Sequence, residues 1–308
     1  MRKQLCEALV ARSPKSDMIF LTGDLGFMAL EDLQAALRER FVNAGVSEQN
    51  MISVAAGMAK QGLEPWVYSI APFCYARPFE QIRNDVTFHG LRVKLLGNGG
   101  GYGYGVMGPT HHAIEDYGVL LTLPGMRVFA PVFDEDIAAV VNAAGDAMGP
   151  VYVRLGRGEC PAGFVVPTYA PYRQLTSGGG PLIIAVGPLA GSYVGPLAAF
   201  DEATRPNLWA VAEMPFSHAP LPAALLQQIQ SATAMFVAEE HVARGGFASE
   251  LGLHLLRANI APPRFHHLCA KAHQYARYGS QVYLRKQSQI DAASLLEMIA
   301  NDSQSAHA

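Results

Sequence analysis

Phe41-Val42-Asn43-Ala44-Gly45-Val46-Ser47-Glu48-Gln49-Asn50-Met51 is a stretch that places one carboxylate at the start of a helix, directly after a short apolar strand. Ser47 belongs to the residue types that favour an N-cap, and Glu48 lies in the first turn, where the helix dipole favours an anion. The helix that follows, to about Lys60, carries mostly small and apolar side chains, which is typical of a packed helix. We therefore expect Glu48 at the edge of a hydrophobic core; taken alone, it is most simply a helix-stabilising acid.

Strands and helices alternate outward from this stretch. The apolar pattern predicts strands at 18–21, 41–46, 66–70, 93–96, 127–130 and 151–154, and helices at 31–40, 47–61, 76–86 and 135–144. Continuous apolar strands that alternate with helices indicate a parallel, doubly wound sheet. A stretch rich in proline and glycine interrupts the pattern, which resumes with a strand at 182–186. We expect an α/β protein with two doubly wound domains, residues 1–165 and 181–308, joined by a linker at 166–180.

Composition limits the classes of partner and compartment. A net charge of −3 with 16% charged residues gives no electrostatic reason to bind nucleic acid or an anionic membrane. The longest apolar runs have strand length, far short of a membrane span, and residues 1–7 show no apolar signal-peptide core. The cysteines form no Cys-x-x-Cys pair and indicate reduced thiols rather than disulfides or zinc ligands; they are Cys6, Cys74, Cys160 and Cys269. We expect a cytoplasmic protein.

Five segments occur in an order and at a spacing that resemble transketolase-like thiamine diphosphate enzymes. The stretch 41–51 resembles the strand, turn and helix of the pyrimidine-binding domain in that family. The others are Phe79-Glu80-Gln81-Ile82-Arg83-Asn84-Asp85, Gly108-Pro109-Thr110-His111, Val151-Tyr152-Val153-Arg154-Leu155-Gly156-Arg157, and Glu239-Glu240-His241 followed by Gly245-Gly246-Phe247. The last resembles the signature of the family's C-terminal domain. The resemblance implies a mostly parallel-sheet pyrimidine-binding domain followed by a transketolase C-terminal-like domain.

The chain has no Gly-Asp-Gly string, which full-length members of the family use, with a later Asn, to hold a divalent metal against the diphosphate. The nearest string, Gly23-Asp24-Leu25-Gly26, lies at the end of the first strand, which is the wrong place. The resemblance therefore implies the C-terminal half of a split enzyme. Such a chain holds the pyrimidine end of thiamine diphosphate and leaves the diphosphate and Mg²⁺ to an N-terminal-half subunit. We expect no metal ligands in this chain and a heterotetramer with two copies of each subunit.

The resemblance also implies roles for particular side chains. Glu48 matches the glutamate that bonds to ring nitrogen N1′ of the aminopyrimidine and promotes the imino tautomer that activates the cofactor. Phe73 matches the aromatic residue that stacks on this ring, the alternative being an ordinary core residue. His111 matches the histidine that handles protons or negative charge on the substrate oxygens, where the alternative is a helix-capping histidine. Arg157 matches an arginine that grips a phosphate or carboxylate of the substrate, with a surface ion pair as the alternative. Arg77 is a weaker substrate candidate, because only some branches of the family have an arginine there.

Residues Gly97 to Gly108 form a glycine-rich loop that leads from a strand to the Gly-Pro-Thr-His segment. The loop lacks the lysine of a P-loop and the spacing of a dinucleotide-binding turn, so we interpret it as a substrate-facing loop. Sugar-phosphate transketolases carry Asp directly before the Gly-Pro-Thr-His segment and His eight residues before that Asp, where this chain has Met107 and Gly99. Neither residue supplies a charge. We expect a roomier, less polar pocket and an acceptor that is larger, modified or not phosphorylated.

The leading interpretation is a subunit of a heteromeric transketolase-like enzyme that depends on thiamine diphosphate and Mg²⁺. It would transfer a two-carbon ketol unit, or a related activated aldehyde, between carbonyl or sugar substrates. The β subunit of a 2-oxo acid dehydrogenase decarboxylating component is an alternative with the same two-domain plan, and a scaffold subunit of this fold is a non-enzymatic one. The strings 47–50 and 108–111 favour the transketolase branch, and a scaffold needs neither Glu48 nor His111.

Overall fold

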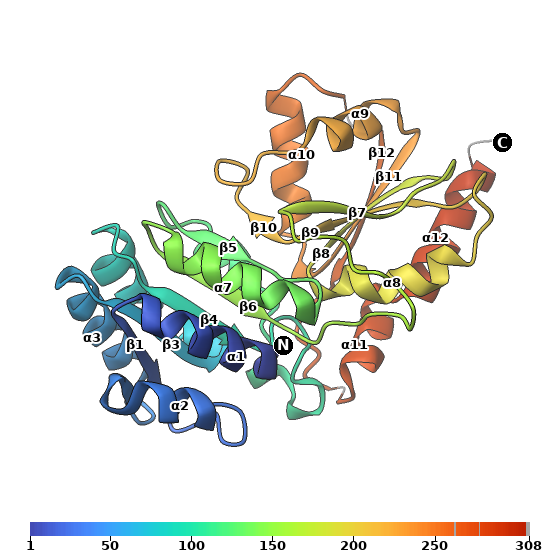
Figure 1. The fold of residues 1–308 in the computed structure, drawn as a ribbon. Helices are drawn as coiled ribbons and strands as arrows, with labels where there is room; N and C mark the ends of the chain where they lie inside the picture. Colours follow the sequence, from blue (N-terminus) through green and yellow to red (C-terminus); the bar gives the residue numbers. More distant parts are fainter. Residues whose placement is uncertain (262, 277, 306–308) are drawn as a thin grey trace.

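The computed structural model describes residues 1–261, 263–276 and 278–305, and the chain forms two sheets with helices packed against them (Figure 1). The first, seven-stranded sheet consists of β1 (Met18–Thr22), β2 (Phe41–Asn43), β3 (Glu64–Ile70), β4 (Lys94–Asn98), β5 (Arg127–Phe129), β6 (Val151–Leu155) and β10 (Glu213–Met214). The helices of this half are α1 (Arg2–Arg12), α2 (Glu31–Leu37), α3 (Glu48–Lys60), α4 (Ala71–Tyr75), α5 (Phe79–Gln81), α6 (Asp116–Leu120) and α7 (Ile137–Asp146). The strand order is β10-β5-β6-β4-β3-β1-β2, and all pairs are parallel except β10–β5.

The second, five-stranded sheet has the order β12-β11-β8-β9-β7, from strands β7 (Tyr172–Thr176), β8 (Leu182–Val186), β9 (Asn207–Val211), β11 (Ala234–Val242) and β12 (Arg264–Ala270). Its helices are α8 (Pro188–Ala198), α9 (Ala223–Ser231), α10 (Phe247–Arg257), α11 (Gln281–Ser288) and α12 (Ala292–Ser305). Only the edge pair β7–β9 is antiparallel. Both sheets are therefore mostly parallel, which confirms the predicted α/β class. No helix in the described part of the chain is long and apolar enough to cross a bilayer.

The strands of the first sheet carry apolar side chains on both faces. Phe20 and Trp66 belong to a core cluster with residues of α1, α2 and α7, whereas Leu21 and Val67 pack with residues of α3 and α6 on the other side. Burial on both faces explains the nearly continuous apolar runs of these strands, because alternation with polar residues would place polar groups in one of the two cores. The cluster that contains Leu21 and Val67 also includes Phe247 of α10. The two halves of the chain therefore share one hydrophobic core.

The carboxyl ends of the parallel strands lie at one edge of the first sheet. There the chain passes from β2 into α3, from β3 into α4, and from β4 into the glycine-rich loop. In open α/β sheets this edge is where ligands bind. Glu48, Phe73 and the loop that precedes His111 follow three different strands and meet at this edge.

The predicted domain boundaries need two corrections. The linker assigned to 166–180 contains β7, which pairs with β9 and so belongs to the second sheet. Strand β10, from the part assigned to the second domain, pairs with β5 of the first sheet, and Glu213 accepts a hydrogen bond from Arg127 there (2.9 Å). The second half of the chain therefore supplies an edge strand to the first sheet, and a single boundary does not separate the two.

Local structure departs from prediction around the site. The helix expected at 76–86 is not continuous: α4 already ends at Tyr75, and helical structure resumes only with α5 and a π-helical turn at Ile82–Thr87. Pro78 lies at the break. A proline interrupts a helix because it lacks a backbone N–H group and disfavours a helical conformation in the residue before it. Strand β2 ends at Asn43, and the Ser47 hydroxyl, at the N-cap of α3, donates to the Ala44 carbonyl (2.7 Å) instead of capping the helix.

Candidate active site

Glu48 is the first residue of α3, and only 5% of it is exposed. Its Oε1 accepts a hydrogen bond from the Ser69 hydroxyl near the end of β3 (3.3 Å). Arg77 Nη1 donates to both carboxylate oxygens, at 3.1 and 3.0 Å. A buried carboxylate at a helix N-terminus, with the dipole and two donors beside it, is a strong acceptor for a further N–H group.

Phe73 and Arg77 complete the surroundings of this carboxylate. The Arg77 guanidinium carbon lies 3.7 Å from the centre of the Phe73 ring, and the arginine side chain is 45% exposed. Phe73 is half-buried, on α4, so it is not enclosed in the core. A planar cation that donates to Glu48 and covers Phe73 shows that the two side chains can bind the same flat, N–H-bearing group.

Cys74 lies beside this site without being available for chemistry. Complete burial, and then the negative charge of Glu48, raise the pKa of its thiol to about 12. The thiol therefore stays protonated at neutral pH and is no nucleophile. All the cysteines are free.

His111 ends a 3₁₀ turn, Pro109–His111, and presents a half-buried ring. The ring makes an edge contact with Phe73 (centroids 5.2 Å apart) and lies 5.8 Å from the ring of Tyr104. Its Nδ1 is 3.0 Å from the Thr110 hydroxyl, which leaves Nε2 available to a ligand. The structure thus brings His111 against the ring that Arg77 covers.

His112 differs from its neighbour. It is buried, its Nε2 bonds to the Gly105 carbonyl (2.9 Å), and burial lowers the pKa of its imidazole. It therefore holds the glycine-rich loop in shape as a neutral side chain.

The pocket beside Gly99 has less room than the sequence predicted. A Cβ atom there would lie 2.2 Å from the Tyr104 ring, and φ is +77°. The Tyr104 hydroxyl accepts a hydrogen bond from Asn98 (2.7 Å), which fixes the ring over Gly99. Tyr104 thus fills the space in which a roomier pocket was predicted, and sequence reasoning missed it because only the folded loop brings it there. The lower charge of this pocket stays a prediction; burial raises the pKa of the Tyr104 hydroxyl, so the ring over Gly99 adds no charge at neutral pH.

Met107 and Arg157 flank the same loop. Met107 is 55% exposed at the end of a 3₁₀ turn. Arg157 is exposed two residues after β6, whose Leu155 carbonyl accepts from the N–H groups of Gly99 and Gly100 at 3.0 and 2.9 Å. Within the described residues Arg157 has no ion-pair partner, which does not favour the surface ion pair considered from sequence.

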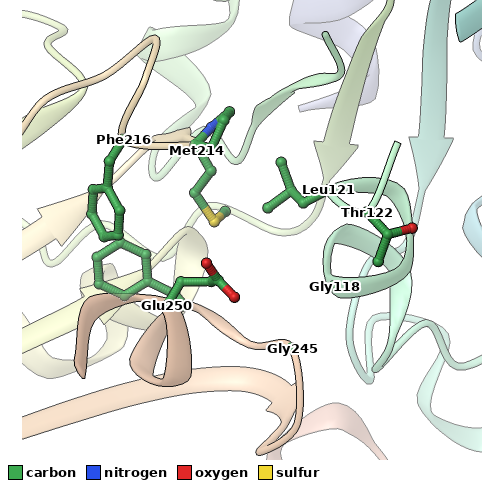
Figure 2. A pocket seen from close by; sticks show the side chains of 9 residues that line it. Gly118, Leu121, Thr122, Met214, Phe216, Gly245 and Glu250 are labelled. Atoms are coloured by element: carbon green, nitrogen blue, oxygen red, sulfur yellow. The ribbon is translucent and has the colours of Figure 1, made fainter. Parts of the chain in front are cut away.

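A separate cavity of about 220 Å³ lies between α6 and α10 (Figure 2). Its walls are mainly apolar, with Leu121, Met214 and Phe216 on them and Glu250 as the acid. None of the side chains predicted to act in catalysis lines it. Among the described residues, no group of three His, Cys, Asp or Glu side chains is placed to hold a metal ion.

Comparisons with known proteins agree with the geometry at the sheet edge. A family model described as the pyrimidine binding domain of transketolase matches residues 7–162. A subunit of the apulose-4-phosphate transketolase of Phocaeicola vulgatus is 36% identical over 162 residues, which are 52% of this chain and 52% of that protein, so the match spans about half of that relative. The subunit of the same name from Actinobacillus succinogenes is 30% identical over 265 residues, 84% of each chain. A solved structure described as a split gene transketolase, inactive beta4 tetramer, covers 97% of both chains at 27% identity with a TM-score of 0.82.

Proposed function

The chain belongs to the transketolase family and corresponds to the C-terminal half of a split transketolase, and on that premise we propose that it is the pyrimidine-binding subunit of a heteromeric, thiamine diphosphate-dependent enzyme. It transfers a two-carbon ketol unit, or a related activated aldehyde, between carbonyl or sugar substrates. The observation that carries the proposal is the buried Glu48 carboxylate beside the half-buried ring of Phe73, with His111 against that ring.

The residues present fit the pyrimidine end of the cofactor. A protonated aminopyrimidine is planar and carries N–H donors, as the guanidinium group of Arg77 does. Arg77 makes the two contacts that such a ring requires, to Glu48 and over Phe73. The arginine is half-exposed and can move away, whereas Glu48 and Phe73 lie on α3 and α4 and stay in place.

Thiamine diphosphate, when bound, supplies a nucleophilic carbon for addition to the donor carbonyl. Glu48, which is buried, holds a proton at N1′ of the pyrimidine and so sets the tautomer of that ring. Phe73 supports the face of the ring. His111 moves protons at the substrate oxygens, and Arg157 binds an anionic group of the substrate. Arg77, once released from Glu48, is free to contact the substrate.

The partner subunit holds the diphosphate and Mg²⁺ through its Gly-Asp-Gly string. The names of the relatives support a partner, since two of them are named as one subunit of a transketolase and the solved β tetramer is described as inactive. Several apolar side chains are exposed in the loops around the site: Phe27, Met28, Val46, Val106 and Met107. We propose that these side chains form part of the surface that meets the partner, since apolar side chains that gather on one exposed surface mark interaction sites.

We expect the chain and its partner, a protein that carries Gly-Asp-Gly, to form a heterotetramer with two copies of each. Obligate interfaces bury more than about 2,000 Å². Analytical ultracentrifugation of the mixture should show a stable complex larger than a heterodimer. Met28→Glu, which puts a charge on the apolar surface, should weaken assembly at least tenfold. Val165→Glu is the matched control, because Val165 is also exposed but lies on the connection after β6. A monomer of this chain that binds the cofactor tightly by itself would contradict the split site.

Met107→Asp should change substrate preference. The wild-type complex should use xylulose 5-phosphate and ribose 5-phosphate poorly as a pair, because Met107 cannot bond to sugar hydroxyls. An aspartate offers a charge-assisted hydrogen bond worth roughly 1.5–3 kcal/mol, so preference for polyhydroxylated donors should rise at least about tenfold while use of the native acceptor falls. The substrate preference is measured by comparing kcat/KM of the wild-type and Met107→Asp complexes over a panel of donors and acceptors, without lipoamide. Equally efficient turnover of the pentose phosphates by the wild type would show that Met107 and Gly99 do not set specificity.

A further inference from the structure

The glycine-rich loop, residues 97–108, is anchored in the second half of the chain by Tyr102. This side chain is fully buried and packs in the same apolar cluster as Leu268 and Leu284, which belong to β12 and α11. Its hydroxyl is bonded to the Ser288 hydroxyl (2.9 Å). A loop that otherwise lies at the edge of the first sheet therefore inserts one aromatic ring into the core around the second sheet.

A buried acid holds the backbone at the same point. Glu240, on β11, accepts a hydrogen bond from the Tyr102 N–H group (3.3 Å) and two from the Gln281 side chain (3.0 and 3.2 Å). Arg285 of α11 donates to Glu240 and also to Glu159. At Gly101, where φ is +62°, a Cβ atom would lie 2.3 Å from a carboxylate oxygen of Glu240. The loop thus has a glycine where the acid approaches the backbone closely.

The anchor lies next to the part of the loop that faces the site. Tyr104, two residues on, covers Gly99 and lies beside His111. The base of the loop closes through two hydrogen bonds between Gly101 and Ala113 (2.8 Å each), directly after the two histidines. Movement at residues 101–102 would therefore displace both Tyr104 and His111.

We infer that Glu240 and Arg285 are positioning residues, through which the second half of the chain fixes the glycine-rich loop and thereby the placement of Tyr104 and His111. The effect on substrate rests on the proposed function, while the anchoring of the loop does not. The second acid of the Glu-Glu-His signature, Glu240, therefore has a structural role: it holds a loop of the first half of the chain in place. A charged acceptor suits the task, as a carboxylate binds backbone N–H groups strongly and only when they are correctly placed.

Hydrogen–deuterium exchange tests the anchor directly. In the full-length chain, alone and in complex with its partner, Glu240→Gln should speed exchange of the amides of residues 99–108 at least tenfold, because the loop opens more often. Glu213→Gln is the matched control: both glutamates are 4% exposed, and Glu213 also joins the two halves, through Arg127 and Tyr169, without touching the loop. It should leave exchange in the loop unchanged. Tyr102→Phe removes only the hydroxyl group, with its hydrogen bonds to Ser288 and to the Ala272 carbonyl. It should speed exchange in the same segment and serves as the test if Glu240→Gln does not fold.

Kinetics of the complex test the positioning role. Glu240→Gln should lower kcat at least tenfold, shift the pH profile of kcat, and leave the affinity for thiamine diphosphate, measured by fluorescence quenching, within twofold. Unchanged loop exchange in both Glu240→Gln and Tyr102→Phe would overturn the anchor, whatever the activity. Faster exchange with unchanged kcat and pH profile would overturn the positioning role. A wild-type complex with an ordered loop but no transfer of two-carbon units would instead refute the proposed function.

Discussion

Glu48→Gln is expected to lower kcat of the assembled enzyme by about a thousandfold or more, on the order of 4 kcal/mol in the barrier, with the fold intact. Glutamine has nearly the same size and can still accept from Ser69 and Arg77. It cannot share a proton with ring nitrogen N1′, so the tautomer that activates the cofactor is no longer favoured. Turnover with saturating cofactor measures the loss, and the exchange rate of the cofactor's C2 proton should fall in parallel.

The control for Glu48 is Glu39→Gln. Glu39 is exposed just before β2, and the same change of charge there should leave turnover within about twofold of the wild type. If the folded Glu48→Gln complex exchanges the C2 proton at the normal rate, Glu48 is only a helix-stabilising residue. The scaffold alternative makes that prediction, since a scaffold loses no activity on substitution of Glu48.

The mostly parallel class of the fold was predictable from the sequence because burial on both faces leaves continuous apolar runs, as in β1 and β6. The antiparallel edge strands were not. Strand β10 has two residues, too few for any periodicity, and β7 lies in a stretch where proline and glycine suggest a loop. Both strands are defined by their pairing partners, which sequence patterns do not show.

The site was predictable only as separate residues. Glu48, Phe73 and His111 stand in motifs that mark them, whereas their arrangement depends on three loops. The bond between Arg77 and Glu48 joins residues 29 apart, and sequence reasoning made Arg77 a substrate candidate only. Tyr104 over Gly99 was missed because a glycine in a sequence gives no sign of which ring will cover it.

The signature 239–241 was recognised as a family mark, but its physical basis appears only in the fold. Glu240 reaches a backbone group 138 residues away, and Glu239 accepts from the Tyr117 hydroxyl, 122 residues away. The His241 ring stacks on Tyr117, and its Nε2 accepts from the Gly118 N–H group (3.1 Å). All three side chains of the signature therefore contact the first half of the chain, so its spacing reflects the joint between the two halves.

Glu239→Gln is expected to lower the free energy of unfolding by about 3–5 kcal/mol, the range for breaking a buried, charged network. The Glu239 carboxylate is fully buried, and each of its oxygens receives two donors. They are the N–H groups of Phe247 (2.7 Å) and Ala248 (3.1 Å) at the start of α10, Tyr117 of the first half, and His267 of β12 (2.8 Å). The amide group of a glutamine would face one of these N–H donors with a donor of its own. Chemical denaturation of the full-length chain measures the loss.

The pH dependence of this loss separates the charge of Glu239 from its shape. Burial alone would raise the pKa of Glu239, but the hydrogen bonds from His267 and from the Tyr117 hydroxyl lower it. A carboxyl whose pKa is lowered in the folded state stabilises the protein fully above its unfolded pKa, about 4.3, and loses this stabilisation as the pH falls through the folded value. The difference between wild type and Glu239→Gln should therefore be constant from pH 7 to about 5 and shrink below about pH 4. Glu250→Gln, an exposed glutamate on the same helix α10, should change stability by less than about 0.5 kcal/mol at any of these values. A difference that persists undiminished in acid would mean that the shape of Glu239, and not its charge, joins the two halves of the chain.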